Sequence, residues 1–131
     1  MDFPLSFIGI PYASRGRSLD GADCYGLVGL VARHVQGRAL PEVTGYTLAH
    51  DSDQVSKAVA TSLPDWQPIP FEKRQPFDVI LFNLLGYPVH MGVVIDNNKM
   101  LHTLRGCESV IERYTSIVWN RRIEGVYRWR N

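Results

Sequence analysis

Residues 23–32 of the chain read DCYGLVGLVA and predict an amphipathic helix with a cysteine in its first turn. Apolar residues recur here and just beyond at the spacing of one helical face. They are Leu27, Leu30, Val31 and Val35. Asp23 is of a type that commonly caps a helix N-terminus, so we expect Cys24 to follow the cap directly.

A cysteine in this position is a candidate nucleophile. Unpaired backbone N–H groups and the positive end of the helix dipole favour a thiolate at Cys24, and the thiolate is the reactive form. A buried structural cysteine is the common alternative. Gly21 and Gly26 lie on either side and would let a substrate approach the backbone, which favours the nucleophile.

The second half of the chain predicts short antiparallel strands. They are expected over residues 77–82, 89–95, 99–104, 110–114 and 125–129. Asp96-Asn97-Asn98 is a strong turn signal that joins the second and third of these as a hairpin. Upstream, residues 52–63 predict a second helix, capped by Asp51 or Ser52 and stopped by Pro64. Helices followed by an antiparallel meander predict an α+β domain, with the N-terminal helices packed on the sheet.

Two histidines fall on the strands of this hairpin. His90 lies in an apolar segment, where a lone histidine is most often a hydrogen-bonded core residue. The turn places residues 93–94 opposite residues 100–101, so His102 should come close to His90 on the same face. One imidazole can then act as a base while the other fixes its orientation and tautomer. With Cys24 they supply the nucleophile, base and orienting group of thiol acyl transfer.

Two alternatives to catalysis involve Cys24: a zinc site shared with the two histidines, and a disulfide. Cys24, His90 and His102 are all legitimate zinc ligands, but no convincing fourth ligand follows with local spacing. Cys107 comes five residues after His102, beyond a glycine, and could instead form a disulfide with Cys24. We favour catalysis over both and expect no metal and no cofactor.

The amino-acid composition is typical of a globular protein. Its 131 residues suffice for one domain, expected over residues 1–131, and are too few for two ordinary ones. The net charge of +1 gives no strong attraction to nucleic acid or to membranes. No apolar run approaches the roughly 18 residues of a membrane span. The opening residues lack a secretory signal, so we expect a protein made in the cytoplasm.

Several motifs occur in order along the chain. They are Gly9-Ile10-Pro11-Tyr12, Asp23-Cys24 with Gly26-Leu27-Val28, Pro76-Phe77-Asp78-Val79-Ile80, His90 with Gly92-Val93-Val94-Ile95, and Met100-Leu101-His102. Together they resemble the NlpC-type cell-wall peptidase family of papain-like cysteine hydrolases. The resemblance implies a papain-like fold, with Cys24 as nucleophile, His90 as base and His102 orienting it. It also assigns Tyr12, Asp23 and Tyr25 to the oxyanion and substrate side of the site.

More narrowly, the chain resembles the tail-tip peptidases of long-tailed bacteriophages. Tyr25 after the nucleophile, Leu40-Pro41 and the terminal stretch at residues 123–128 are typical of them. Tyr25 stands where many cellular members have a serine that contacts the peptide. The resemblance implies an endopeptidase acting on the peptidoglycan stem peptide, carried in a virion tail tip with other tail-tip proteins as partners. A structural tail-tip plug with little activity, or a free phage lysis enzyme, are the alternatives.

Other polar and aromatic residues are given ordinary roles. His34 and His50 are expected to be exposed and structural. The tryptophans should anchor the core or an interface; they are Trp66, Trp119 and Trp129. Arginines make the last fifth of the chain basic. We interpret them as a solvated face, with a docking patch for an acidic partner or wall polymer as the alternative.

Overall fold

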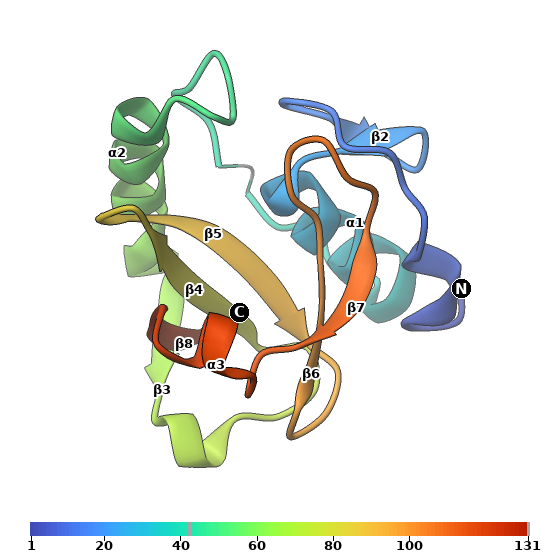
Figure 1. The fold of residues 1–131 in the computed structure, drawn as a ribbon. Helices are drawn as coiled ribbons and strands as arrows, with labels where there is room; N and C mark the ends of the chain where they lie inside the picture. Colours follow the sequence, from blue (N-terminus) through green and yellow to red (C-terminus); the bar gives the residue numbers. More distant parts are fainter. Residues whose placement is uncertain (42, 131) are drawn as a thin grey trace.

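The computed structural model describes residues 1–41 and 43–130 and contains helices on both sides of a twisted sheet (Figure 1). The α-helices are α1 (Cys24–Gln36), α2 (Ser52–Ser62) and the short α3 (Ile117–Asn120). The larger sheet contains β3 (Trp66–Ile69), β4 (Val79–Leu84), β5 (Tyr87–Val94), β6 (Lys99–His102), β7 (Val110–Arg113) and β8 (Ile123–Trp129). Two short strands, β1 (Arg17–Ser18) and β2 (Gly21–Ala22), form a separate pair before α1. Short 3-10 turns cover Leu5–Phe7, Leu63–Asp65 and Phe71–Lys73.

The larger sheet is antiparallel throughout, in the order β3-β8-β4-β5-β6-β7. This confirms the expected α+β class, with helices packed on an antiparallel sheet. The expected meander is only partly right, because the last strand, β8, inserts between β3 and β4. Such a pairing joins the end of the chain to its middle, and local sequence patterns carry no information about it.

The sheet separates two apolar clusters. Along β4, Val79 and Leu81 pack with α1 and α2, whereas Ile80 and Phe82 pack on the opposite face with α3. A strand buried on both faces has no polar alternation, which explains the continuous apolar run in the sequence. The position of the site follows from this layering, because α1 is fixed against β5.

The helix boundaries agree with the capping signals. The Asp23 carboxylate accepts a hydrogen bond from the Gly26 N–H at 2.9 Å, and Gly37 ends α1 in the left-handed conformation. Asp51 caps α2 in the same way. The hairpin register, with Val93 opposite Leu101, is also as expected.

Strand β3 and helix α3 were not predicted. Residues 66–69 contain Pro68, and proline is disfavoured inside a sheet because it lacks the N–H of a ladder hydrogen bond. Because β3 is an edge strand, Pro68 can pair there without its missing N–H disrupting a ladder on both sides. Helix α3 is too short for a periodic apolar pattern, yet it places Trp119 in the core.

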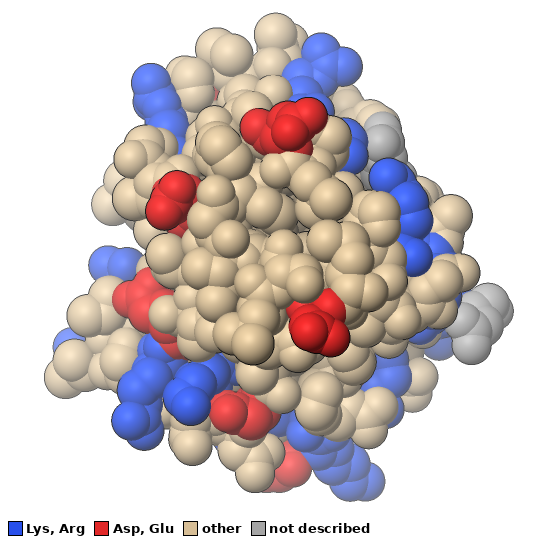
Figure 2. Space-filling model, turned by 90° about the vertical axis from the view of Figure 1, so that its right-hand side faces the viewer, with Lys and Arg blue, Asp and Glu red and all other residues tan. Residues whose placement is uncertain are grey.

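The charged surface has no single dominant sign. Figure 2 shows Lys and Arg side chains spread around the margins of one face, separated by acidic residues and by uncharged surface. In the described part of the chain, no helix combines the length and the apolar character needed to cross a membrane.

Two glycines in α1 differ sharply in their surroundings. A Cβ at Gly26 would lie 1.9 Å from the Gly16 carbonyl oxygen, whereas a Cβ at Gly29 would meet nothing within 4 Å. The absence of a side chain at Gly26 therefore lets the loop before β1 cross directly over the start of α1.

This contrast predicts opposite effects of the same substitution in one helix. Gly26→Ala should lower the free energy of unfolding by about 1–3 kcal/mol, because backbone must move to admit the methyl group. Gly29→Ala should raise it by about 0.5–1 kcal/mol through helix propensity. Urea unfolding of both variants measures the difference, and equal effects would contradict the close crossing at Gly26.

Candidate active site

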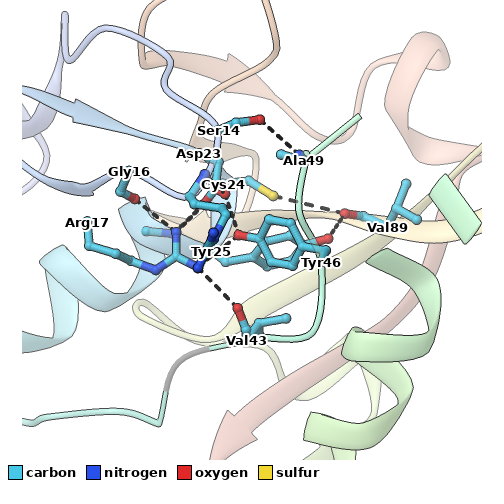
Figure 3. Close-up of polar contacts among 12 residues, drawn as sticks. Ser14, Gly16, Arg17, Asp23, Cys24, Tyr25, Val43, Tyr46, Ala49 and Val89 are labelled. Atoms are coloured by element: carbon cyan, nitrogen blue, oxygen red, sulfur yellow. Dashed lines mark hydrogen bonds and ion pairs between the residues drawn. The ribbon is translucent and has the colours of Figure 1, made fainter. Parts of the chain in front are cut away.

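Cys24 is the first residue of α1 and points toward β5. The side chain is buried, and its Sγ lies 4.0 Å from the carbonyl oxygen of Val89 (Figure 3). Cys24 and His90 line the same pocket, which has a volume of about 210 Å³. Helix α1 and strand β5 therefore bring a thiol and an imidazole to one cavity, although 66 positions separate them in the sequence.

A chain of hydrogen bonds leads away from His90 across the sheet. The Nε2 of His90 lies 2.8 Å from the Nδ1 of His102. The Nε2 of His102 in turn lies 2.7 Å from Oε1 of Glu112 on β7. The predicted contact between His90 and His102 is confirmed. Because Nε2 of His90 is engaged, Nδ1 is the ring nitrogen available for proton exchange with Cys24.

Aromatic rings enclose the two imidazoles. Trp119 lies with its ring centroid 5.3 Å from that of His90 and 5.0 Å from that of His102. Phe82 contacts both His90 and Trp119. This packing leaves His90 3% exposed and His102 1% exposed, so both rings are held in one orientation and shielded from water.

Burial sets the protonation states of the site. Desolvation, followed by the charge of Asp23, raises the pKa of the Cys24 thiol to about 12. Desolvation, followed by repulsion from His102, lowers the pKa of His90 to about 3. Burial thus opposes the thiolate that the helix dipole favours at Cys24. Both shifts favour the uncharged forms of Cys24 and His90 at neutral pH, before a substrate binds.

The Asp23 side chain is buried and held by several hydrogen bonds. Its carboxylate accepts hydrogen bonds from the Arg15 N–H at 2.9 Å and from Arg17 Nη1 at 2.8 Å, in addition to the cap on Gly26. The Tyr46 hydroxyl donates a further bond (Figure 3). The carboxylate is fully buried and does not line the pocket, and its hydrogen bonds fix the start of α1, where Cys24 lies. The expected contact of Asp23 with substrate or oxyanion stays a prediction.

Tyr25 is also directed into the protein. Its side chain is 6% exposed, and its hydroxyl donates to the carbonyl of Val89. Its ring packs against Tyr46, with 5.8 Å between centroids. Tyr25 does not line the pocket of Cys24 and His90, and its expected contact with the substrate stays a prediction. The large ring fills the space between α1, β5 and the segment around Tyr46, a function that a serine at this position would not serve.

Tyr12 lines the pocket together with Cys24 and is half-buried. Desolvation, followed by the nearby Cys24, raises the pKa of the Tyr12 phenol to about 12, so the hydroxyl remains a hydrogen-bond donor at neutral pH. This position and protonation state fit the oxyanion role that the resemblance assigns to it.

Sequence reasoning missed several residues of the site. His50, interpreted only as exposed and structural, lines the pocket, as does Arg105. Glu112 and Trp119 contact the histidine pair but lie on elements whose position depends on long-range packing. Residues 110–113 read VIER, so the local sequence does not distinguish Glu112 from an ordinary surface carboxylate.

Neither a metal site nor a disulfide is formed by the side chains of residues 1–41 and 43–130. There, no group of three or more His, Cys, Asp or Glu side chains is arranged to hold a metal ion. Cys24 and Cys107 are both free thiols, the first buried and the second exposed.

Comparison with known proteins identifies the family. The model of the NlpC/P60 family matches residues 9–128, which is most of the chain. The chain belongs to the NlpC/P60 family. Membership confirms the resemblance seen in the sequence motifs. No curated protein matches the sequence.

Solved NlpC/P60 structures share the fold. A lipoprotein-like NLP/P60 family protein of Staphylococcus aureus superposes with a TM-score of 0.71 at 23% identity, over 97% of this chain and 39% of that one. An NlpC/P60 family protein of Bacillus cereus gives 0.68 at 23% identity, over 94% and 36%. The NlpC/p60 domain of the peptidoglycan hydrolase SagA gives 0.63 at 19% identity, over 95% and 91%. The chain thus spans well under half of the S. aureus and B. cereus chains and most of the SagA domain.

Exposure and protonation predict the order of thiol labelling in this NlpC/P60 domain. Iodoacetamide at neutral pH should modify Cys107 at least about tenfold faster than Cys24, because Cys107 is exposed and Cys24 is a buried neutral thiol. Peptide mass spectrometry assigns the modified residue, with Cys24→Ala and Cys107→Ala proteins as controls. Preferential labelling of Cys24 would mean that the resting site contains a thiolate after all.

Proposed function

We propose that the protein hydrolyses an amide bond in the peptidoglycan stem peptide, with Cys24 as nucleophile, His90 as base and His102 orienting His90. One observation carries the proposal: the hydrogen-bonded histidine pair ends in the pocket that contains the Cys24 thiol. Family membership supports a peptidase, and the SagA domain belongs to a peptidoglycan hydrolase.

The neutral resting pair defines the first step. As the Cys24 sulfur attacks the amide carbonyl, its proton passes to Nδ1 of His90, so the thiolate need not exist before substrate binds. The carbon–oxygen double bond opens to an oxyanion. Backbone N–H groups at the start of α1 and the Tyr12 hydroxyl are the available donors to it.

Collapse of this intermediate completes acylation. The carbon–nitrogen bond breaks, the amine takes the proton from His90, and the acyl group remains on sulfur as a thioester. His90 then removes a proton from water as the water attacks the thioester, and it returns this proton to the Cys24 sulfur on release of the carboxylic acid. Every proton transfer uses His90, which explains the value of a fixed ring orientation.

Charge in the pocket suits the proposed substrate. Stem peptides carry free carboxylates, and by family resemblance the cleaved bond follows γ-D-glutamate. Arg105 is exposed at the pocket and His50 lines it as well. A positive side chain in the pocket that contains the nucleophile favours such an acidic peptide over a neutral one.

Hydrolysis of purified peptidoglycan tests this function. Cys24→Ala should lower the rate about a thousandfold or more, because the covalent route is lost, while Cys107→Ala should retain the rate of the original protein. Addition of EDTA should leave the rate unchanged. Release of peptides measured by liquid chromatography provides the readout. Full activity of the Cys24→Ala protein would exclude the proposed nucleophile.

We further propose that the protein works from a bacteriophage tail tip, in contact with other tail-tip proteins, to open the cell wall locally. The support is the set of sequence features shared with tail-tip peptidases, namely Tyr25, Leu40-Pro41 and residues 123–128. The burial of Tyr25 adds a physical reason for an aromatic residue there, since its ring fills space between α1 and β5.

Purified phage particles should contain the protein at a few copies each, and antibody should label the distal end of the tail. Quantitative mass spectrometry of gradient-purified particles, compared with the lysate, measures the copy number. A lysate rich in the protein with none in the particles would contradict the tail-tip proposal and favour a free lysis enzyme. Particles containing an inactive protein would instead favour a structural plug.

A further inference from the structure

Glu112 occupies a defined place beside the histidine pair. In the β6–β7 ladder, His102 pairs with Val110 and Met100 with Glu112, so Glu112 is a diagonal neighbour of His102 on the same face. The β5–β6 register, with Val94 opposite Met100, makes His90 a diagonal neighbour of His102 from the other side. Three adjacent strands thus align His90, His102 and Glu112 in one row.

The carboxylate dictates which nitrogens carry protons. An ionised Glu112 can only accept, so the Nε2 of His102, 2.7 Å away, must be protonated. In a neutral ring, Nδ1 of His102 is then an acceptor, and it must receive a proton from Nε2 of His90 at 2.8 Å. His90 is left with an unprotonated Nδ1, which is the state required to accept the Cys24 proton.

The reverse arrangement would disable the base. With no acceptor beyond it, His102 could carry its proton on Nδ1 and donate to Nε2 of His90. His90 would then hold its proton on Nδ1 and could not accept another one from Cys24. The two tautomer patterns are similar in energy for isolated imidazoles, so a hydrogen-bond acceptor beyond His102 is needed to select one of them.

We propose that Glu112 is a positioning residue that fixes the tautomers of His102 and His90 in the state competent for catalysis. The inference rests on the proposed hydrolytic function, since it assigns His90 as the base. Glu112 is 43% exposed and keeps part of its hydration, so its charge is less costly to maintain than a buried one. Desolvation lowers the pKa of His102, and the hydrogen bond and charge of Glu112 oppose this shift.

Three variants separate this role from simple loss of charge. Glu112→Ala removes the acceptor and should lower kcat roughly ten- to a hundredfold with little change in KM. Glu112→Gln keeps a carbonyl acceptor at the same length and should recover most of the rate. Glu72→Ala removes an exposed carboxylate from the 3-10 turn Phe71–Lys73, away from the site, and should match the original protein.

Nitrogen-15 NMR of histidine-labelled protein gives a readout that does not depend on activity. In the original protein both His90 and His102 should show the Nε2–H tautomer at neutral pH. In Glu112→Ala at least one ring should change to the Nδ1–H form or to a mixture. A His102 protonated on Nδ1 in the original protein, or unchanged tautomers and rates in Glu112→Ala, would overturn the proposal.

The two proposals fail in distinguishable ways. Retention of hydrolysis by Cys24→Ala would overturn the hydrolytic function while leaving the tautomer measurement intact. Loss of rate in both Glu112→Ala and Glu112→Gln with unchanged tautomers would instead assign Glu112 a purely structural role. Thermal unfolding of each variant shows whether the measured protein is folded, and the spectrum of the original protein decides the matter even if Glu112→Ala does not fold.

Discussion

The buried carboxylate of Asp23 joins the segments on which the candidate site depends. It caps α1, binds the loop before β1 through the Arg15 N–H, and receives Arg17 and Tyr46. Arg17 extends the network to the carbonyl of Val43 at 3.1 Å. A charged group can be fully buried here because each oxygen is satisfied by hydrogen bonds and a cation lies alongside it. The position of Cys24, one residue later, follows from this arrangement.

Burial then decides how the site can react. The same packing that fixes Cys24 and the two histidines also removes water, and this keeps the thiol and both imidazoles uncharged at neutral pH. Charge must therefore develop during the reaction. Groups that stabilise it at that moment, namely the N–H donors at the start of α1 and the carboxylate of Glu112, gain importance in a low-dielectric site.

The sequence predicted those features that depend on neighbouring residues. The cap at Asp23 and the hairpin register that unites His90 with His102 both follow from short patterns, since a turn and a cap act over a few positions. The insertion of β8, the approach of Trp119 and the partnership of Glu112 with His102 depend on pairing between distant strands. The burial of Asp23 and Tyr25 was missed for a similar reason. A sequence motif shows which residues are adjacent to Cys24 along the chain, whereas burial depends on distant segments that pack against them.

A covalent intermediate on Cys24 is the most direct test of the account as a whole. A synthetic stem peptide can be mixed with the protein, the reaction quenched in acid after milliseconds to seconds, and the protein mapped by mass spectrometry. The account predicts an acyl group of the mass of the N-terminal product, attached to the peptide that contains Cys24 and absent from the Cys24→Ala protein. Turnover of the substrate with no acyl group on Cys24 at any time, or with the acyl group on Cys107, would contradict it.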